Sequence, residues 1–147
     1  MKILETKEKK KILEQLNKQY GISDIPFELI KFGEEKIRIF SGSIEKKELS
    51  ILDKELRIEN IGLYFAKQEV DGIRLTFDGI QIFKNQITKN ILELNKEQAD
   101  DWLKGNEIQT DAERGFKILR YNNEFIGCGK STGIKIANYM PKERRVK

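Results

Sequence analysis

The sequence has no histidine, one cysteine (Cys128) and only two prolines among its 147 residues. Without an imidazole the chain can form neither a Ser/His/Asp nor a Cys/His nucleophile pair, and it lacks the usual ligands of a structural zinc site. A single cysteine excludes an internal disulfide, which favours a reducing compartment such as the cytoplasm. Catalysis would have to rely on carboxylates or lysines, so we expect no cofactor and no enzymatic activity.

Long hydrophobic runs are also missing. No stretch approaches the ~18 consecutive apolar residues of a membrane-spanning helix, and the N-terminus lacks the apolar segment of a signal peptide. We therefore expect a soluble cytoplasmic protein with no membrane partner. Hydrophobic residues make up 38% and charged residues 35% of the chain, which suits a modest core under a well-solvated surface. The bias toward Lys, Glu and Ile resembles that of heat-adapted proteins, an archaeal-like character.

Positive charge is concentrated at the C-terminal end of the sequence. Residues 130–147 hold six Lys or Arg against one acid, a local balance of +5, whereas the whole chain carries only +4. Everything before residue 130 therefore sums to −1. An end of this kind predicts a polyanionic partner.

The first half of the chain mixes helical and strand patterns. Residues 6–20 place apolar side chains at helical spacing and are followed by Gly21, which predicts one amphipathic helix. Residues 61–67 and 73–77 predict a strand pair across the turn Val70-Asp71-Gly72. Two further elements are expected: a strand at 36–40 and a helix on Ile44, Leu49, Leu52 and Leu56. These patterns indicate a compact α+β domain over residues 1–84.

A second unit is predicted for residues 85–147, a short strand, a helix and then several strands. Asn95 is a good N-cap for a helix over residues 96–104, and residues 106–114 are expected to be a loop. Strands are predicted at 91–94, 116–121, 124–128 and 134–137, with a turn at Asn122-Asn123. This order of elements outlines a small barrel.

Two motifs in this unit have plainer interpretations than catalysis. Gly129-Lys130-Ser131 is the end of a Walker A motif, but position 124 is Glu instead of Gly and no helix pattern follows, so NTP binding is disfavoured. The flanking glycines fit a curved strand that needs close backbone approach. We interpret Cys128 as a small buried strand residue and Trp102 as the core anchor of its helix.

The C-terminal residues also carry a family resemblance. The segments Ile91-Leu-Glu-Leu, Trp102-Leu-Lys-Gly-Asn, Gly115-Phe-Lys-Ile-Leu-Arg-Tyr, Phe125-Ile-Gly-Cys-Gly-Lys and Asn138-Tyr-Met-Pro-Lys-Glu-Arg-Arg together resemble the PUA domain. They are most similar to its versions in NIP-type ribosome-biogenesis factors and in the C-terminal extension of Sun-family RNA cytosine methyltransferases. Residues 20–85 resemble the small pre-PUA domain of those proteins. The resemblance implies a PUA-like β pseudo-barrel that binds structured RNA, either rRNA or tRNA.

We therefore expect non-catalytic binding of structured RNA in ribosome biogenesis or RNA modification. The alternative is an accessory subunit that presents RNA to a separate modifying enzyme, and a protein partner is possible in either case. The N-terminal domain, being near neutral, would orient the barrel or dock that partner. The predicted RNA-binding residues are Lys104, Gly105, Arg120, Tyr121, Gly127, Gly129, Lys130, Lys135, Tyr139, Lys142, Arg144 and Arg145.

Overall fold

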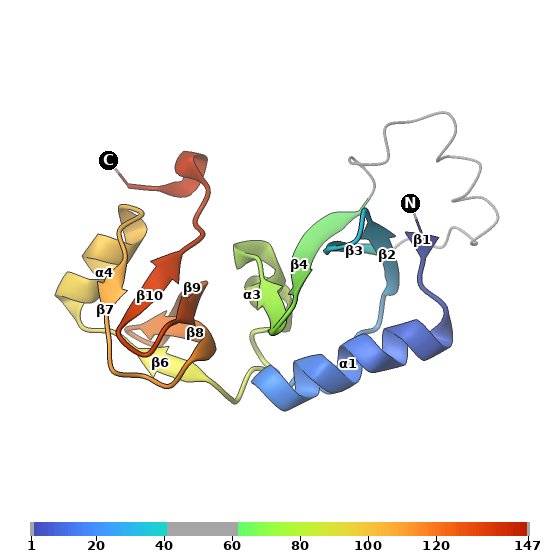
Figure 1. The fold of residues 1–147 in the computed structure, drawn as a ribbon. Coiled ribbons are helices and arrows are strands. Elements are labelled where there is room, and N and C mark those ends of the chain that lie inside the picture. Colours follow the sequence, from blue (N-terminus) through green and yellow to red (C-terminus); the bar gives the residue numbers. More distant parts are fainter. Residues whose placement is uncertain (1, 41–61, 147) are drawn as a thin grey trace.

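The computed structural model describes residues 2–40 and 62–146, which form two five-stranded sheets and three α-helices (Figure 1). The first half comprises β1 (Lys2–Ile3), α1 (Thr6–Tyr20), β2 (Glu28–Phe32), β3 (Lys36–Phe40), β4 (Leu63–Glu69), β5 (Gly72–Leu75) and α3 (Phe77–Phe83). The second half comprises β6 (Ile91–Glu93), α4 (Lys96–Leu103), β7 (Ile108–Gln109), β8 (Gly115–Tyr121), β9 (Glu124–Ser131), β10 (Lys135–Asn138) and a 3-10 helix, η2 (Lys142–Arg144).

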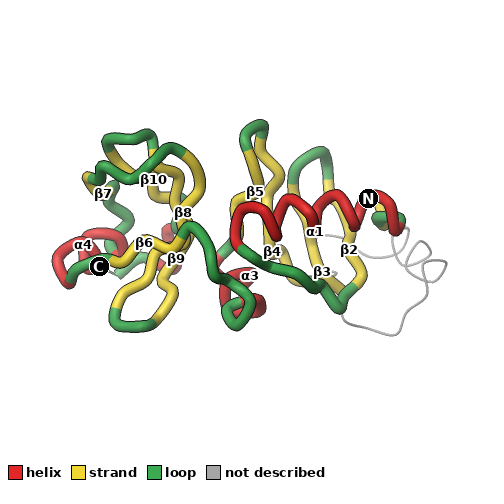
Figure 2. Tube along the Cα trace, turned by 90° about the horizontal axis from the view of Figure 1, so that it is seen from below, coloured by secondary structure: helices red, strands yellow, loops and turns green. Residues whose placement is uncertain are grey.

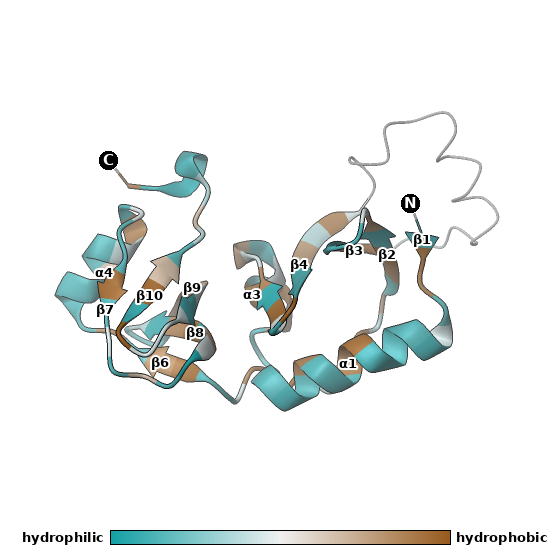
Figure 3. Cartoon of the chain, viewed as in Figure 1, coloured by the Kyte–Doolittle hydropathy of each residue, from teal (hydrophilic) through white to brown (hydrophobic). Residues whose placement is uncertain are grey.

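The first sheet is an antiparallel meander with the strand order β1-β2-β3-β4-β5. Helix α1 runs across one face of it, as Figure 2 shows from below, and buries Ile12, Leu16 and Tyr20 there. Figure 3 shows α1 as a largely hydrophilic helix interrupted by brown, hydrophobic positions. Gly21 ends the helix in the left-handed conformation with φ 87° and donates its N–H to the carbonyl of Asn17. The predicted helix and its stop are confirmed.

Helix α3 lies between the two sheets and joins their cores. It packs against β4 on one side and β9 on the other. The main hydrophobic core continues past it, because Phe116, Ile118 and Cys128 of the second sheet belong to the same buried cluster as the side chains under α1. A single core thus spans the predicted boundary between residues 84 and 85. The division into two domains remains a prediction.

The second sheet is strongly curled and has the order β6-β8-β9-β10-β7. Its β6 pairs with β8 in parallel, and its other pairs are antiparallel. Asn122 and Asn123 both adopt positive φ, as a tight two-residue hairpin between β8 and β9 requires. Helix α4 closes a second core around Trp102 and begins at Asn95 in a capping box. The mixed α+β class predicted from the sequence is confirmed.

Several elements differ from the sequence-based prediction. Helix α3 begins at Phe77, which we expected to end a strand, and occupies residues for which no element was predicted. Strand β7 lies within the predicted loop 106–114. Strand β9 continues through Ser131. The Walker-like Gly129-Lys130 is therefore not followed directly by the helix that a phosphate-binding loop needs. The helix predicted on Ile44, Leu49, Leu52 and Leu56 lies outside the described residues. None of the helices in the described ranges is long and apolar enough to cross a membrane.

Candidate functional site

A groove of about 830 Å³ lies between the two sheets. One wall comes from β3, β4, β5 and the start of α3, and the other from α4, β9 and the C-terminal tail that follows β10 (Figure 1). Its lining contains five cationic side chains and one acid: Lys36, Arg38, Lys67, Arg74, Arg144 and Asp78. Four of the five cations belong to the first sheet. We expected the N-terminal domain, being near neutral, only to orient the barrel or dock a partner. That expectation overlooked the cations that it contributes to this wall.

The cations of the first wall form a row across three adjacent strands. Lys36 of β3 is paired in register with Lys67 of β4, and Lys67 in turn with Arg74 of β5. We call these three residues the cation row. Like charges directly opposite each other destabilise a sheet, so the row needs a compensating anion. Part of that compensation is internal, because Lys67 lies 3.3 Å from Glu35 and Arg74 lies 3.5 Å from Glu69.

Lys36 and Arg38 keep their charges available to a ligand. The Lys36 Nζ lies 5.5 Å from the centre of the Tyr64 ring. The Arg38 Nη1 donates to the carbonyl of Gly62 at 3.2 Å. Within residues 2–40 and 62–146 neither side chain has a carboxylate partner. Residues alternate in Lys36-Ile-Arg-Ile, which places both cations on the strand face opposite the core. This alternation was the sequence signal for a cationic surface that the sequence analysis missed.

The opposite wall rests on Trp102, which is 1% exposed and anchors the second core, as its sequence context predicted. Gly127 and Gly129 face this indole. A Cβ at Gly127 would lie 2.6 Å from the Trp102 Nε1, and one at Gly129 would lie 2.3 Å from the Ile136 Cγ2. Both glycines are buried, so they make room for side chains inside the protein. Gly127 also lines the groove. The RNA contact expected of both glycines remains a prediction.

The C-terminal tail forms the rim of this wall and is held by hydrogen bonds. The Asn138 Nδ2 donates to the carbonyls of Trp102 at 2.9 Å and Asn106 at 3.0 Å, which satisfies the end of α4. The backbone N–H of Val146 donates to the carbonyl of Leu103 at 2.7 Å. The tail is therefore an ordered part of the fold and not a solvated charged arm.

Two residues of the tail contact the first half of the molecule across the groove. The guanidinium of Arg74 lies 4.2 Å from the centre of the Tyr139 ring. The Arg144 Nη2 donates to both carboxylate oxygens of Asp78, at 3.2 and 3.1 Å, above the Phe77 ring. The structure thus brings Gly127, Tyr139 and Arg144 of the predicted set to the groove.

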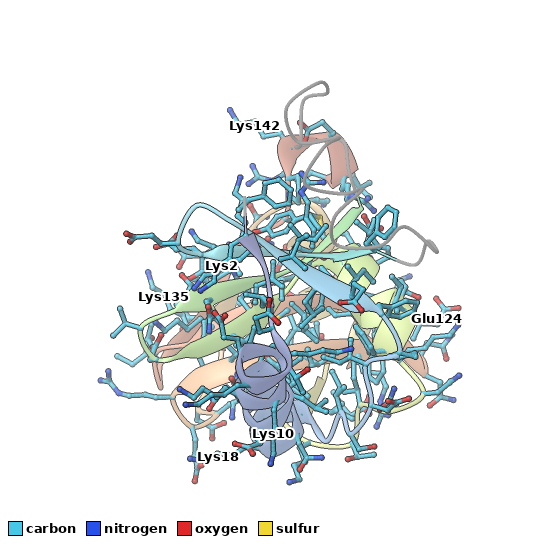
Figure 4. The ribbon with its side chains drawn as sticks, turned by 90° about the vertical axis from the view of Figure 1, so that its right-hand side faces the viewer. Lys2, Lys10, Lys18, Glu124, Lys135 and Lys142 are labelled. Atoms are coloured by element: carbon cyan, nitrogen blue, oxygen red, sulfur yellow. The ribbon has the colours of Figure 1, made fainter. Side chains whose placement is uncertain are left out.

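The other predicted cations do not gather at one place. Three of them pair with carboxylates: Arg120 with Glu93, Lys130 with Asp71 at 2.5 Å, and Lys135 with Glu107 at 3.0 Å. The Lys130 hydrogen bond lowers the pKa of Asp71 and raises the pKa of Lys130 itself. Figure 4 shows Lys135 and Lys142 on different sides of the molecule. Each of the three paired cations therefore has a neighbouring carboxylate as its partner.

Most of the remaining predicted residues belong to the end of α4 or to the tail that follows β10. Lys104 and Lys142 are exposed and have no ion-pair partner among the described residues. Gly105 has φ +91°, and a Cβ there would lie 2.5 Å from the Arg145 side chain. The Arg145 Nε donates to the carbonyl of Met140 at 3.1 Å. Tyr121 packs against the second core. This end therefore presents two exposed cations, unpaired within the described part of the chain, and a tightly packed arginine.

Cys128 is buried on β9, and its Sγ lies 3.9 Å from the Tyr20 hydroxyl oxygen. Burial raises the pKa of the thiol from 9.0 to about 11, so it stays protonated at neutral pH and is a poor nucleophile. Its interpretation as a small buried strand residue is confirmed. In the part of the chain that the structure describes, no three Cys, Asp or Glu residues lie close enough together to hold a metal ion.

Comparison with known proteins identifies the second half of the fold. Residues 89–146 match the family model of the methyltransferase RsmF PUA domain. This part of the chain is similar to a PUA domain. The predicted resemblance to the PUA-like extension of Sun-family RNA methyltransferases and the predicted PUA-like pseudo-barrel are thereby confirmed, and the match supports RNA binding.

Relatives of the chain carry the name ribosomal RNA small subunit methyltransferase F. The protein from Psychromonas ingrahamii is 33% identical over 99 residues, which are 63% of this chain and 21% of the relative. The protein from Vibrio cholerae is 26% identical over 140 residues, or 93% of this chain and 28% of the relative. The chain therefore spans 21% to 28% of these relatives, and the longer match includes its N-terminal half.

These names correct one prediction and leave others open. The expectation that the protein is not an enzyme is wrong by this comparison, because the relatives are methyltransferases of which the chain matches the PUA-containing part. The relatives are bacterial, so nothing here supports an archaeal-like character. Cytoplasmic location and a protein partner remain predictions.

Proposed function

We propose that this chain binds structured ribosomal RNA and positions it for methylation, with the PUA domain as the main contact. The observation that carries this proposal is the match of residues 89–146 to the PUA domain of a methyltransferase whose relatives act, by name, on small-subunit rRNA. The methyltransferase would be either part of the same polypeptide or a separate protein to which this chain presents RNA.

The surface at the end of α4 supports this role. Lys104 and Lys142 are exposed, and no described carboxylate neutralises them. Cations of this kind bind phosphates through counterion release, which gives affinity without sequence preference. The ordered tail holds Lys142 and Arg144 at fixed positions beside the groove, so phosphates would meet a preformed surface.

The proposal is tested by RNA binding of the full chain as a function of salt. A fluorescently labelled fragment of small-subunit rRNA with both paired and looped regions is titrated with the protein between 50 and 200 mM salt, as such studies typically use. We expect binding that weakens steeply with salt, and a slope that is less negative by about 1 for each of Lys104→Gln and Lys142→Gln. The proposal would be contradicted if the protein did not bind this RNA at the lowest salt concentration, or if its affinity did not fall as salt is added.

A further inference from the structure

We propose that the groove between the two sheets binds an unpaired segment of RNA, with phosphates on the cation row and a base against the aromatic side chains of the groove. This inference rests on the proposed function, and it adds the N-terminal sheet as half of the binding site. Nothing in the resemblance to the PUA domain assigns a role to Lys36, Lys67 and Arg74, which lie outside residues 89–146.

The charge of the groove points to a polyanion. Five cations and one carboxylate line it, a balance of +4 equal to that of the whole chain. Three of these cations occupy directly opposed positions of neighbouring strands, an arrangement that costs stability in the free protein. A row of phosphates that crosses the exposed face of these strands would relieve that repulsion.

The aromatic residues of the groove point to a nucleic acid with free bases. Tyr64, Phe77 and Tyr139 all line it, and Phe77 and Tyr139 are 39% and 37% exposed. Tyr139 already stacks under the Arg74 guanidinium, the kind of planar surface on which unpaired bases stack. An acidic peptide would use the cations but would leave these rings without a partner.

The dimensions of the groove favour an unpaired segment over a double helix. Its volume of about 830 Å³ lies within the ~300–1,000 Å³ of sites that enclose small-molecule ligands. Such a space accepts an exposed nucleotide. In a duplex the bases are stacked on one another, so only the backbone could reach the cations, and the aromatic lining would remain unused.

At the rim of the groove, Arg144 can exchange its partner Asp78 for a phosphate of the RNA. In the free protein both N–H···O contacts of Arg144 go to this carboxylate, and both side chains are roughly half exposed. A phosphate entering the groove can replace the carboxylate as the acceptor of the same donors. Exposed ion pairs contribute little to stability, so this exchange has a small energetic penalty.

The test uses the full chain, a stem–loop RNA and a fully paired duplex of the same stem. The groove variant combines Lys36→Gln and Lys67→Gln, and the matched control combines Lys10→Gln and Lys18→Gln. The control removes the same charge from α1, on the other face of the sheet (Figure 4). We expect tighter binding of the stem–loop than of the duplex, and a salt slope for the groove variant that is less negative by about 1.4 than that of the control.

A second pair of variants isolates stacking. Tyr139→Leu keeps an apolar side chain but removes the ring, and it should weaken binding of the stem–loop by about 5- to 150-fold. Tyr139→Phe keeps the ring and should bind nearly as tightly as the wild type. Equal losses in both variants would mean that the hydroxyl is what contributes, and the stacking role would be overturned.

Four outcomes decide between the proposals. If the wild type binds neither RNA, the proposed function fails together with this inference. If it binds RNA but the groove variant matches the α1 control, only the inference fails. Equal affinity for duplex and stem–loop also overturns the inference. Competition by polyglutamate as strong as by single-stranded RNA of equal charge would identify the groove as a site for an acidic protein segment instead.

Discussion

Single residues show which sequence signals carried structural information. Trp102, Cys128 and Gly21 have the roles expected of them, because each depends on near neighbours in the chain or on general burial preference. Gly127 and Gly129 are predicted RNA contacts, and the structure adds that both face Trp102. Trp102 lies about 25 positions away on α4, so only the tertiary fold could reveal this packing.

Gly129→Ala tests the packing role of this glycine. Its Cβ would meet the Ile136 Cγ2 at 2.3 Å and the carbonyl oxygen of Ala137 at 2.9 Å, so the strands must shift. We expect a loss of about 1–3 kcal/mol in the free energy of unfolding, measured by urea denaturation. Lys135→Ala, an exposed control on the neighbouring strand, should change it by less than about 0.5 kcal/mol. Equal stability of the glycine variant and the wild type would refute the packing role.

The buried thiol makes stability depend on alkaline pH. The pKa of Cys128 rises from 9.0 to about 11 in the folded protein, so the unfolded chain loses this proton first. Stability should therefore fall as the pH rises from 9 toward 11. Burial also raises the pKa of Tyr20, which adds to the same slope. In urea denaturation over this range, Cys128→Ala should give a shallower decline than the wild type, and identical declines would contradict the assignment.

At the scale of elements, the sequence predicted strongly periodic segments and missed short ones. Helix α1 and strand β3 have the predicted bounds because their apolar spacing is unambiguous. Helix α3 has seven residues and contains Gly79, which is a poor helix former. The structure explains that glycine, since a Cβ there would lie 2.2 Å from the Phe65 carbonyl oxygen. Tertiary packing against β4 therefore decides an element that local propensity does not predict.

The N-cap of α4 gives a test at this scale. The Asn95 Oδ1 accepts from the backbone N–H of Gln98 at 2.8 Å, and the Gln98 Oε1 accepts from the N–H of Asn95 at 3.0 Å. Asn95→Ala should reduce the free energy of unfolding by about 1 kcal/mol, whereas Asn95→Ser should retain most of it. Thermal denaturation followed by circular dichroism measures both. A serine variant as unstable as the alanine variant would show that capping is not the cause.

At the scale of the whole molecule, charge was the least predictable property. In the sequence, the excess cations lie from residue 130 onward. In the fold, Lys130 and Lys135 pair with acids, and the cation row lies on the first sheet. Net charge along a chain does not reveal which side chains share a surface, because that depends on strand register. The partner class followed from composition and resemblance, whereas the position of the groove needed the structure.

The shared core makes a prediction about cooperativity. Because one hydrophobic cluster includes residues of both sheets, we expect the chain to unfold in a single transition. Trp102 is the only tryptophan and reports on the second core, while far-ultraviolet circular dichroism reports on the whole chain. The two urea transitions should coincide. Separate transitions would instead support independent domains at residues 1–84 and 85–147.

The central claim is that RNA lies between the two sheets, and photocrosslinking tests it most directly. A stem–loop RNA with 4-thiouridine in its loop is bound to the full chain and irradiated, and the crosslinked residues are identified by mass spectrometry. We predict crosslinks to the groove aromatics Tyr64, Phe77 and Tyr139, which come from both halves of the molecule. Crosslinks confined to α1, or to the β8 end around Arg120 and Tyr121, would contradict the account.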